Sequence, residues 1–363
     1  MLVKFNDNAQ SVYTGKKLKV KIFGASHSEK IGVQVKGFKG EKVDMQKLQE
    51  FLDRRKPKKT VDSTKRNEAD EVIIEKGLKG NALKSNFVAV IFNTDQKSKD
   101  YSNLIKKPRP SHADYVATAK YGDGYDYRGG GKFSGRLTAP MCIAGGICKQ
   151  ILEEKGIKIN AYLSSIGQVK GKSYGDIDQE NFDFEKIDKS FPLLDESVKE
   201  QMQNQIEKAS KNGDSVGGVI DCVITGVPVG TGEYMFDSIE SVISHLAFGV
   251  PAVKGIEFGR GFEISSLNGS VANDPFYYDN GVVKTKSNNN GGINGGIANG
   301  MPITFRVAIK PTPSILIEQD TVDLVTKQNT KITVQGRHDS CIAVRAVAVI
   351  EAISAIAIYD LID

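Results

Sequence analysis

Three of the four histidines in this chain lie in short segments rich in glycine, proline and small polar residues, and these side chains suit proton chemistry. His27 lies in Gly-Ala-Ser-His-Ser, His112 in Pro-Ser-His-Ala-Asp, and His338 in Gly-Arg-His-Asp-Ser. Histidine has the side chain whose proton equilibrium lies nearest neutral pH. We therefore predict one proton-handling site assembled from distant parts of the chain. The fourth histidine, His245, lies in a predicted apolar helix, and we expect it to be structural.

Basic residues in turns and at element ends could bind an anion beside these histidines. Three successive glycines at 129–131 let backbone amides approach a negative charge, and forked guanidinium groups match carboxylates and phosphates. The cations in such positions are Arg55, Arg109, Arg128, Lys132, Arg136, Lys310, Arg337 and Arg345. Together the residues predict proton transfer to or from a phosphorylated or carboxylated small molecule.

Four common motifs are absent. The GGGK segment at 129–132 lacks the upstream glycine and the following Ser or Thr of a P-loop. No predicted strand leads into GxGxxG, and no GxSxG occurs. His338, Asp339 and Cys341 imitate a metal cluster, but without HExxH or paired cysteines we expect no metal site.

Composition indicates an ordinary globular protein with many tight turns. The chain has 363 residues, 37 of them glycine, and a formal charge of +5, which suits an anionic substrate better than nucleic acid. The cysteines have no framework spacing, so we expect buried free thiols in a reducing cytoplasm. They are Cys142, Cys148, Cys222 and Cys341.

The sequence predicts no membrane segment. The N-terminus has no apolar run long enough for a signal peptide. The most apolar stretch, 341–362, is interrupted by Arg345, Glu351 and Asp360, whereas a membrane span needs about 20 apolar residues. We predict a buried helix there.

Hydrophobic periodicity predicts the elements that position these groups. Predicted strands cover 18–23, 31–35, 72–74, 87–92, 216–225, 255–264, 301–310 and 331–334. Predicted helices cover 45–56 (capped by Asp44), 137–154, 195–211, 237–248 (capped by Asp237) and the stretch after 336–340, which caps it. A further short helix is predicted to open within 109–115 and to end near Gly122. The Asn/Gly-rich stretch 287–300 has the composition of a flexible loop. These elements alternate unevenly and their turns favour antiparallel pairing, which predicts one large α+β domain over 1–363.

Seven ordered motifs make the chain resemble the chorismate synthase family from about residue 18 to residue 362. They are GASHS at 24–28, DRRKP at 53–57, NTDQ at 93–96, RPSHADY at 109–115, RGGG at 128–131, KPTPS at 310–314 and GRHD at 336–339. The resemblance implies a β-α-β sandwich with antiparallel-rich sheets around a central helical layer.

The resemblance also implies a lyase of the shikimate pathway. Its reaction is a 1,4-elimination of phosphate from 5-enolpyruvylshikimate 3-phosphate that gives chorismate and requires reduced FMN. It associates the chain with NADP, with an external flavin reductase as the electron source, and with a cytoplasmic homotetramer. The apolar helix at 137–152 would supply an interface of that tetramer. No membrane or nucleic-acid partner is implied.

Roles for particular residues follow from the same resemblance. His27 would protonate the leaving phosphate, His112 would face reduced flavin near N1, and Asp339 would lie near N5, assisted by Ser26 and Ser134. Arg55, Arg136, Arg337 and Arg345 would hold the anions of substrate and flavin. The flavin contacts would be Lys132, Phe133, Ser134, Ala252, Gly295, Lys310, Pro311, Thr312, Pro313, Ser314 and Arg337. The stretch around Gly295 would then approach the cofactor.

The chain departs from the family pattern at a few positions. Ala25 and Ser28 stand where the family has Glu and Gly, Phe133 replaces a small hydroxyl residue, Leu137 replaces a carboxylate, and Val61 replaces a basic residue. These departures leave open a non-catalytic binder of flavin or of a phosphorylated ligand. A nucleic-acid-binding protein is a further alternative, suggested by the basic run 54–66, although surface solvation explains that run better.

Overall fold

Alternating apolar residues build a five-stranded antiparallel sheet from the first quarter of the chain. The computed structural model describes residues 11–56, 69–94, 106–122, 125–179, 182–334 and 339–362. In spatial order the first sheet contains β1 (Ser11–Thr14), β2 (Lys19–Phe23), β3 (Lys30–Lys36), β5 (Ala82–Phe92) and β4 (Ile73–Lys79). Val20 and Ile22 of β2 are buried, whereas Lys19 is exposed, as the period of two requires.

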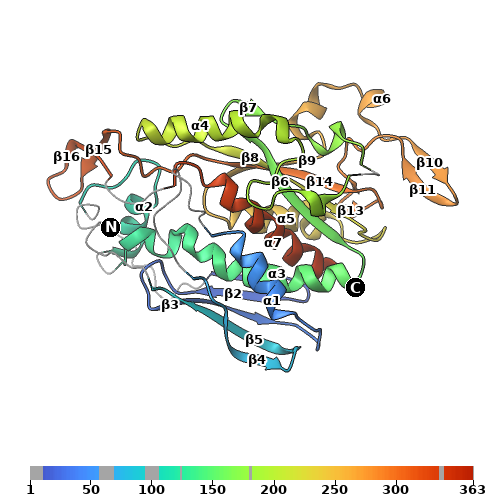
Figure 1. Ribbon diagram of the computed structural model, residues 1–363, viewed down its shortest axis with the longest axis horizontal. Coiled ribbons are helices and arrows are strands. Elements are labelled where there is room, and N and C mark those ends of the chain that lie inside the picture. The colour runs from blue at the N-terminus through green and yellow to red at the C-terminus, as the bar shows by residue number, and fades with distance from the viewer. Residues whose placement is uncertain are drawn as a thin grey trace.

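A second five-stranded antiparallel sheet forms from the rest of the chain. Its order is β7 (Val169–Lys170), β6 (Lys158–Ile166), β8 (Gly218–Thr225), β14 (Ile303–Ile309) and β9 (Val253–Phe258). Helix α4 (Lys199–Lys211) lies along this sheet and buries Met202 and Ile206 (Figure 1).

A layer of helices lies between the two sheets (Figure 1). It contains α1 (Met45–Asp53), α3 (Thr138–Glu154), α5 (Ile239–Phe248) and α7 (Ala343–Leu361). Small residues let α3 and α7 pack closely, because a Cβ on Gly145 would overlap Ala352. The predicted α+β class, antiparallel pairing and central helical layer are confirmed. The assignment of all of 1–363 to one domain stays a prediction.

Helix α7 is almost wholly buried, which confirms the buried helix predicted from 341–362. Its carboxylates are paired. Asp360 accepts hydrogen bonds from the backbone N–H groups of Lys16, Lys17 and Leu18, at 2.7–2.9 Å, and so ties the β1–β2 turn to the helix. None of the helices that the structure describes is long and apolar enough to cross a membrane. All four cysteines are buried free thiols, as predicted.

The remaining α-helices and the β-hairpins outside the two sheets are short. They are α2 (Asp114–Tyr121), α6 (Gly269–Ala272) and three hairpins, β10 (Phe276–Asp279) with β11 (Val282–Thr285), β12 (Ile293–Asn294) with β13 (Ile297–Ala298), and β15 (Gln319–Asp323) with β16 (Gln328–Ile332). In Figure 1 the β10–β11 hairpin projects from one end of the molecule and β15–β16 from the other.

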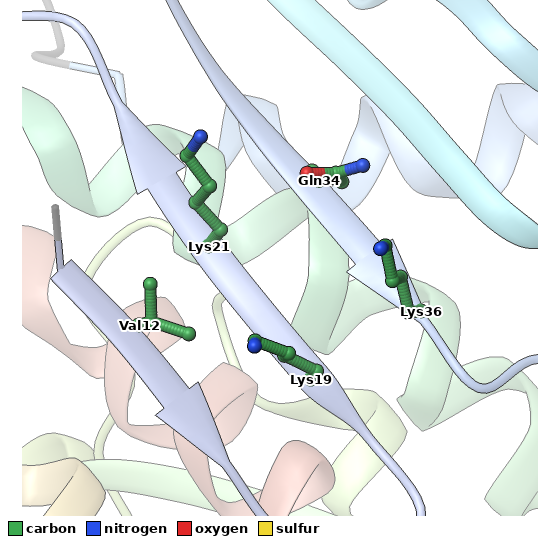
Figure 2. A pocket seen from close by; sticks show the side chains of 5 residues that line it. All are labelled: Val12, Lys19, Lys21, Gln34 and Lys36. Atoms are coloured by element: carbon green, nitrogen blue, oxygen red, sulfur yellow. The ribbon is translucent and has the colours of Figure 1, made fainter.

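The first sheet carries a shallow basic hollow on its outer face. Figure 2 shows Val12, Lys19, Lys21, Gln34 and Lys36 around this hollow of about 220 Å³. Since these residues point away from the helical layer, the hollow is separate from the site described below.

Several sequence-based expectations need correction. Segment 287–300 is ordered rather than a flexible loop, because it forms β12–β13 and the Asp274 carboxylate accepts hydrogen bonds from the backbone of Asn289 and Asn290. Helix α5 is capped by Ser238, whose Oγ accepts from the Ser241 N–H, and not by Asp237.

Two further corrections concern α7 and α3. Helix α7 begins at Ala343 without a side-chain cap, so within the described residues 339–340 do not cap it. The apolar residues of α3 are buried inside this chain and offer no free interface. The expectation that His245 is structural agrees with its place on α5, where its exposed ring lies 5.7 Å from that of Tyr13.

Candidate active site

The glycine loop after α2 lies between the two predicted histidines. Gly129, Gly130 and Gly131 all have positive φ, at 58°, 86° and 54°. A Cβ on Gly129 would lie 2.6 Å from Cε1 of His27, and one on Gly130 would lie 3.3 Å from Nε2 of His112. Only glycine fits here, since L-residues avoid this backbone region and no space remains for a side chain. The loop therefore brings segments 85 residues apart in sequence to one place.

His27 is held in a buried turn after β2. Its Nδ1 lies 3.2 Å from the Ser26 Oγ, and the Ser26 backbone N–H donates to the Gly131 carbonyl at 3.1 Å. Ser28 closes the turn, because its Oγ accepts from the Ala25 N–H and donates to the Lys30 carbonyl. The departures from the family pattern at 25 and 28 thus leave the turn intact.

His112 is held by a buried ion pair at the start of α2. The Asp114 carboxylate accepts from Nε of Arg109 at 2.7 Å and lies 2.7 Å from Nδ1 of His112. Burial alone would raise the pKa of Asp114, but hydrogen bonds and charge from Arg109 and His112 hold it well below its usual range. The same Nδ1 lies 3.0 Å from NH2 of Arg109, so the ring is fixed on its Nδ1 side while Nε2 faces Gly130.

The predicted arginines form a second cluster behind the His27 turn. Asp70 is buried and accepts hydrogen bonds from both Arg55, at 2.7 Å, and Arg136. Nε of Arg136 also donates to Asn93, at 3.0 Å, and the Asn93 amide donates to the Ser28 carbonyl at 2.7 Å. This chain of hydrogen bonds connects the arginines to the histidine turn.

Arg345 and Asp339 extend this cluster from α7. Nε of Arg345 donates to the Arg55 carbonyl at 2.9 Å, and its NH1 group donates to Asp339 at 2.5 Å. The structure therefore joins three predicted anion-binding arginines and Asp339 in one network. Arg337 and His338 lie outside the described residues.

The 310–314 segment reaches the His112 side of the site. Nζ of Lys310 donates to the Ser111 carbonyl at 2.6 Å, and Ser314 Oγ accepts from Arg109 at 3.0 Å. The Lys310 backbone N–H donates to the carbonyl of Ala252, which has a positive φ of 75°. Burial, with Lys254 nearby, lowers the pKa of Lys310. Pro311, Thr312 and Pro313 lie within this segment.

The residues after the glycine loop present an aromatic surface. Phe133 is 39% exposed and packs against Tyr121 and Tyr125, with ring centroids 6.4 and 6.0 Å apart. Lys132 lies over the Tyr121 ring. Ser134 caps the following turn by accepting from the Arg136 N–H.

Gly295 is a predicted flavin contact, but none of the contacts described above connects it to His27 or His112. It lies in the turn between β12 and β13, and that hairpin pairs with the loop at 230–232. Its role stays a prediction.

Two residues that sequence reasoning left unassigned are central to this geometry. Asp70 and Asp114 each neutralise buried cations, and neither was given a role from the sequence. For Asp114 a signal existed, because it lies two residues after His112 and five after Arg109. For Asp70 the local sequence gives none.

Unsatisfied donors in this region fit an anionic ligand. Within the described part of the chain, Nε of Arg55 and Oγ1 of Thr312 are buried without a hydrogen-bond partner. Such groups cost free energy unless something binds them. In the 310–314 segment, the buried Oγ1 of Thr312 is a group that a phosphate-bearing cofactor would satisfy.

A pair of histidines beside buried arginines is the arrangement of an enzyme that acts on an anionic small molecule. The chain belongs to the chorismate synthase family, whose family model matches residues 18–362. It is 41% identical over 351 residues to a chorismate synthase of Dehalococcoides mccartyi, covering 96% of this chain and 95% of the relative. It is 42% identical over 349 residues to one of Thermococcus kodakarensis, covering 95% and 96%. A crystal structure of a chorismate synthase superposes with a TM-score of 0.73 at 25% identity, covering 96% of this chain and 92% of the other.

Proposed function

We propose that this enzyme is a lyase that converts 5-enolpyruvylshikimate 3-phosphate to chorismate with reduced FMN as cofactor. The observation that carries the proposal is the glycine loop between His27 and His112, beside the buried arginine cluster. Family membership over residues 18–362 supports the same reaction. The product serves the shikimate pathway.

The arginine cluster is proposed to bind the substrate's anionic groups. Arg55, Arg136 and Arg345 supply guanidinium donors in a region largely removed from water, where charge-assisted hydrogen bonds are strong. The orphaned Nε of Arg55 is a donor that a phosphate or carboxylate oxygen would satisfy. Fixing the substrate in this way is worth more than charge attraction alone, because it orients the bond that breaks.

His27 is proposed to give a proton to the departing phosphate. Its ring is buried, and the Ser26 Oγ at 3.2 Å from Nδ1 orients the imidazole beside the glycine loop. Asp339 is proposed to accept, at its carboxylate, the proton that the six-membered ring of the substrate loses. Ser26 and Ser134 are proposed to assist this proton transfer. General acids and bases of this kind contribute about 10²–10⁴ in rate.

The flavin is proposed to lie between the His112 side of the site and the 310–314 segment. When bound, reduced FMN supplies electron density for breaking the C–O bond. Lys310, Ser314, Ala252 and the Lys132–Ser134 turn would hold it, with His112 oriented by Asp114. Arg337 and Gly295 are proposed as further contacts.

We propose a cytoplasmic homotetramer that receives reduced FMN from an external reductase and has no nucleic-acid or membrane partner. Three consecutive exposed side chains, Tyr234, Met235 and Phe236, support an interface at the 228–237 loop. They replace α3 as the candidate contact surface. One domain over 1–363 is also proposed.

An anaerobic assay tests the proposed reaction. Wild-type protein with photoreduced FMN is expected to form chorismate from 5-enolpyruvylshikimate 3-phosphate, and no product is expected without flavin. If folded protein binds flavin but forms no chorismate, the proposed reaction is wrong. That result would favour a non-catalytic protein that binds flavin.

A further inference from the structure

Asp70 occupies a strained and deeply buried position just before β4. Its φ is +49° and its side chain is only 2% exposed. Helix α1 holds its backbone, because Gln49 donates to the Asp70 carbonyl at 3.1 Å and accepts from the Val72 N–H at 3.1 Å. A residue kept in this backbone region at a cost of about 1–3 kcal/mol points to a functional constraint.

Each carboxylate oxygen of Asp70 serves a different arginine. Oδ2 accepts from Arg55 at the end of α1, and Oδ1 accepts from Arg136 just before α3. Burial alone would raise the pKa of Asp70, but the two guanidinium groups outweigh it and lower the pKa below its usual range. The carboxylate is therefore charged at neutral pH and fixes the relative position of two cations from separate elements.

The neighbouring arginine makes a contrasting pair. Arg54 turns into the core and binds Glu351 of α7 through two hydrogen bonds of 2.8 and 2.7 Å. Glu351 is as buried as Asp70 and also contacts a second cation, Lys149, at 3.6 Å. Both terminal nitrogen atoms of Arg54 are used there, while its Nε, like that of Arg55, is buried without a partner within the described residues. The Glu351 cluster is thus a structural counterpart of the Asp70 cluster.

We propose that Asp70 is a positioning residue that aligns Arg55 and Arg136 to bind the phosphate-bearing anion of the proposed reaction. The inference rests on the proposed function for the identity of that anion. Asp70 bridges NH groups of both guanidinium groups and leaves Nε of Arg55 buried without a partner within the described residues. An anion at that open donor would be bound by a pair whose geometry is already set.

Charge and orientation predict opposite effects when Asp70 is neutralised. The carboxylate reduces the charge of the arginine pair from +2 to +1, so charge alone predicts tighter anion binding in Asp70→Asn. Orientation predicts weaker binding, because an Asn amide nitrogen cannot accept from a guanidinium group and would release one arginine. Whether anion affinity rises or falls in Asp70→Asn therefore shows which effect is larger, charge or orientation.

The experiment measures binding of inorganic phosphate and of 5-enolpyruvylshikimate 3-phosphate by calorimetry. We expect Asp70→Asn to weaken both by at least about tenfold, in line with the cost of a displaced binding group. Asp70→Glu keeps the charge but moves it by one methylene, and it is expected to weaken binding as well. Glu351→Gln is the matched control, and it is expected to change binding less than twofold although it loses stability.

The outcomes are separable from those of the proposed function. Equal or tighter phosphate binding by folded Asp70→Asn would overturn the inference, as would an equal loss in Glu351→Gln. A wild-type protein that binds no phosphate at millimolar concentration would overturn it too. Phosphate binding that needs Asp70, in a protein that makes no chorismate, would support the inference and reject the proposed reaction. If Asp70→Asn does not fold, Asp70→Glu decides the question in the same way.

Discussion

Substitution of Gly129 by alanine tests whether the glycine loop sets the position of His27. A Cβ there would lie 2.6 Å from Cε1 of His27, whereas carbon atoms in contact lie about 3.5–4.0 Å apart. The ring must therefore move by about 1 Å, and a displacement of that size costs about 10²-fold in rate. Because φ at this position is +58°, an alanine there is also expected to lower the free energy of unfolding by about 1–2 kcal/mol.

Two alanine variants separate these effects. Gly80 has a φ of +60° in the β4–β5 turn and open space around it, so Gly80→Ala carries the backbone cost without the clash. Gly135, in the same loop region as Gly129, has neither a positive φ nor a close neighbour, so Gly135→Ala is expected to behave like wild type. The assay is anaerobic chorismate formation together with urea unfolding of each variant.

We expect Gly129→Ala to lose about 10²-fold in kcat, and Gly80→Ala to lose stability alone. Near-normal turnover in Gly129→Ala would show that the His27 ring does not depend on the loop. An equal loss of turnover in Gly80→Ala would attribute the defect to stability.

Two further predictions concern His112 and Glu351. His112→Ala should lose most turnover, about 10²–10⁴-fold, with little change in unfolding, and near-normal turnover would refute the role given to His112. Glu351 has a pKa lowered from 4.5 to about 2, because Arg54 and Lys149 outweigh the effect of burial, which alone would raise it. Its charge then contributes about 3 kcal/mol of stability, which is fully present above pH 4.5 and lost as the pH falls toward 2. Glu351→Gln should therefore make the free energy of unfolding, measured with urea, depend less on pH across that window, while turnover is kept. The same pH dependence as in wild type would contradict this.

The sequence predicted the elements where periodicity is strong. The alternation in β2 and the long apolar run of α7 both correspond to buried faces in the structure. Local signals were less reliable at element ends. Ser238 caps α5 although Asp237 is an equally good cap by type, because only the backbone geometry decides between neighbours.

The candidate site was predictable only where a motif carried it. His27, His112 and the glycine loop belong to short segments with a chemical signature, and the structure brings them together. Asp70 has no such signature, since its importance comes from Arg55 and Arg136, which reach it from other elements. The apolar composition of α3 led to the wrong prediction of a subunit interface. A helix buried in its own chain and one buried in an interface have the same composition.

The most direct test of this account is an anaerobic single-turnover experiment on wild type and His27→Ala. With reduced FMN, wild type should release one phosphate for each chorismate formed. His27→Ala should still bind 5-enolpyruvylshikimate 3-phosphate but release phosphate about 10²–10⁴-fold more slowly. Phosphate release at the wild-type rate in His27→Ala, or no chorismate from flavin-loaded wild type, would contradict the central claim.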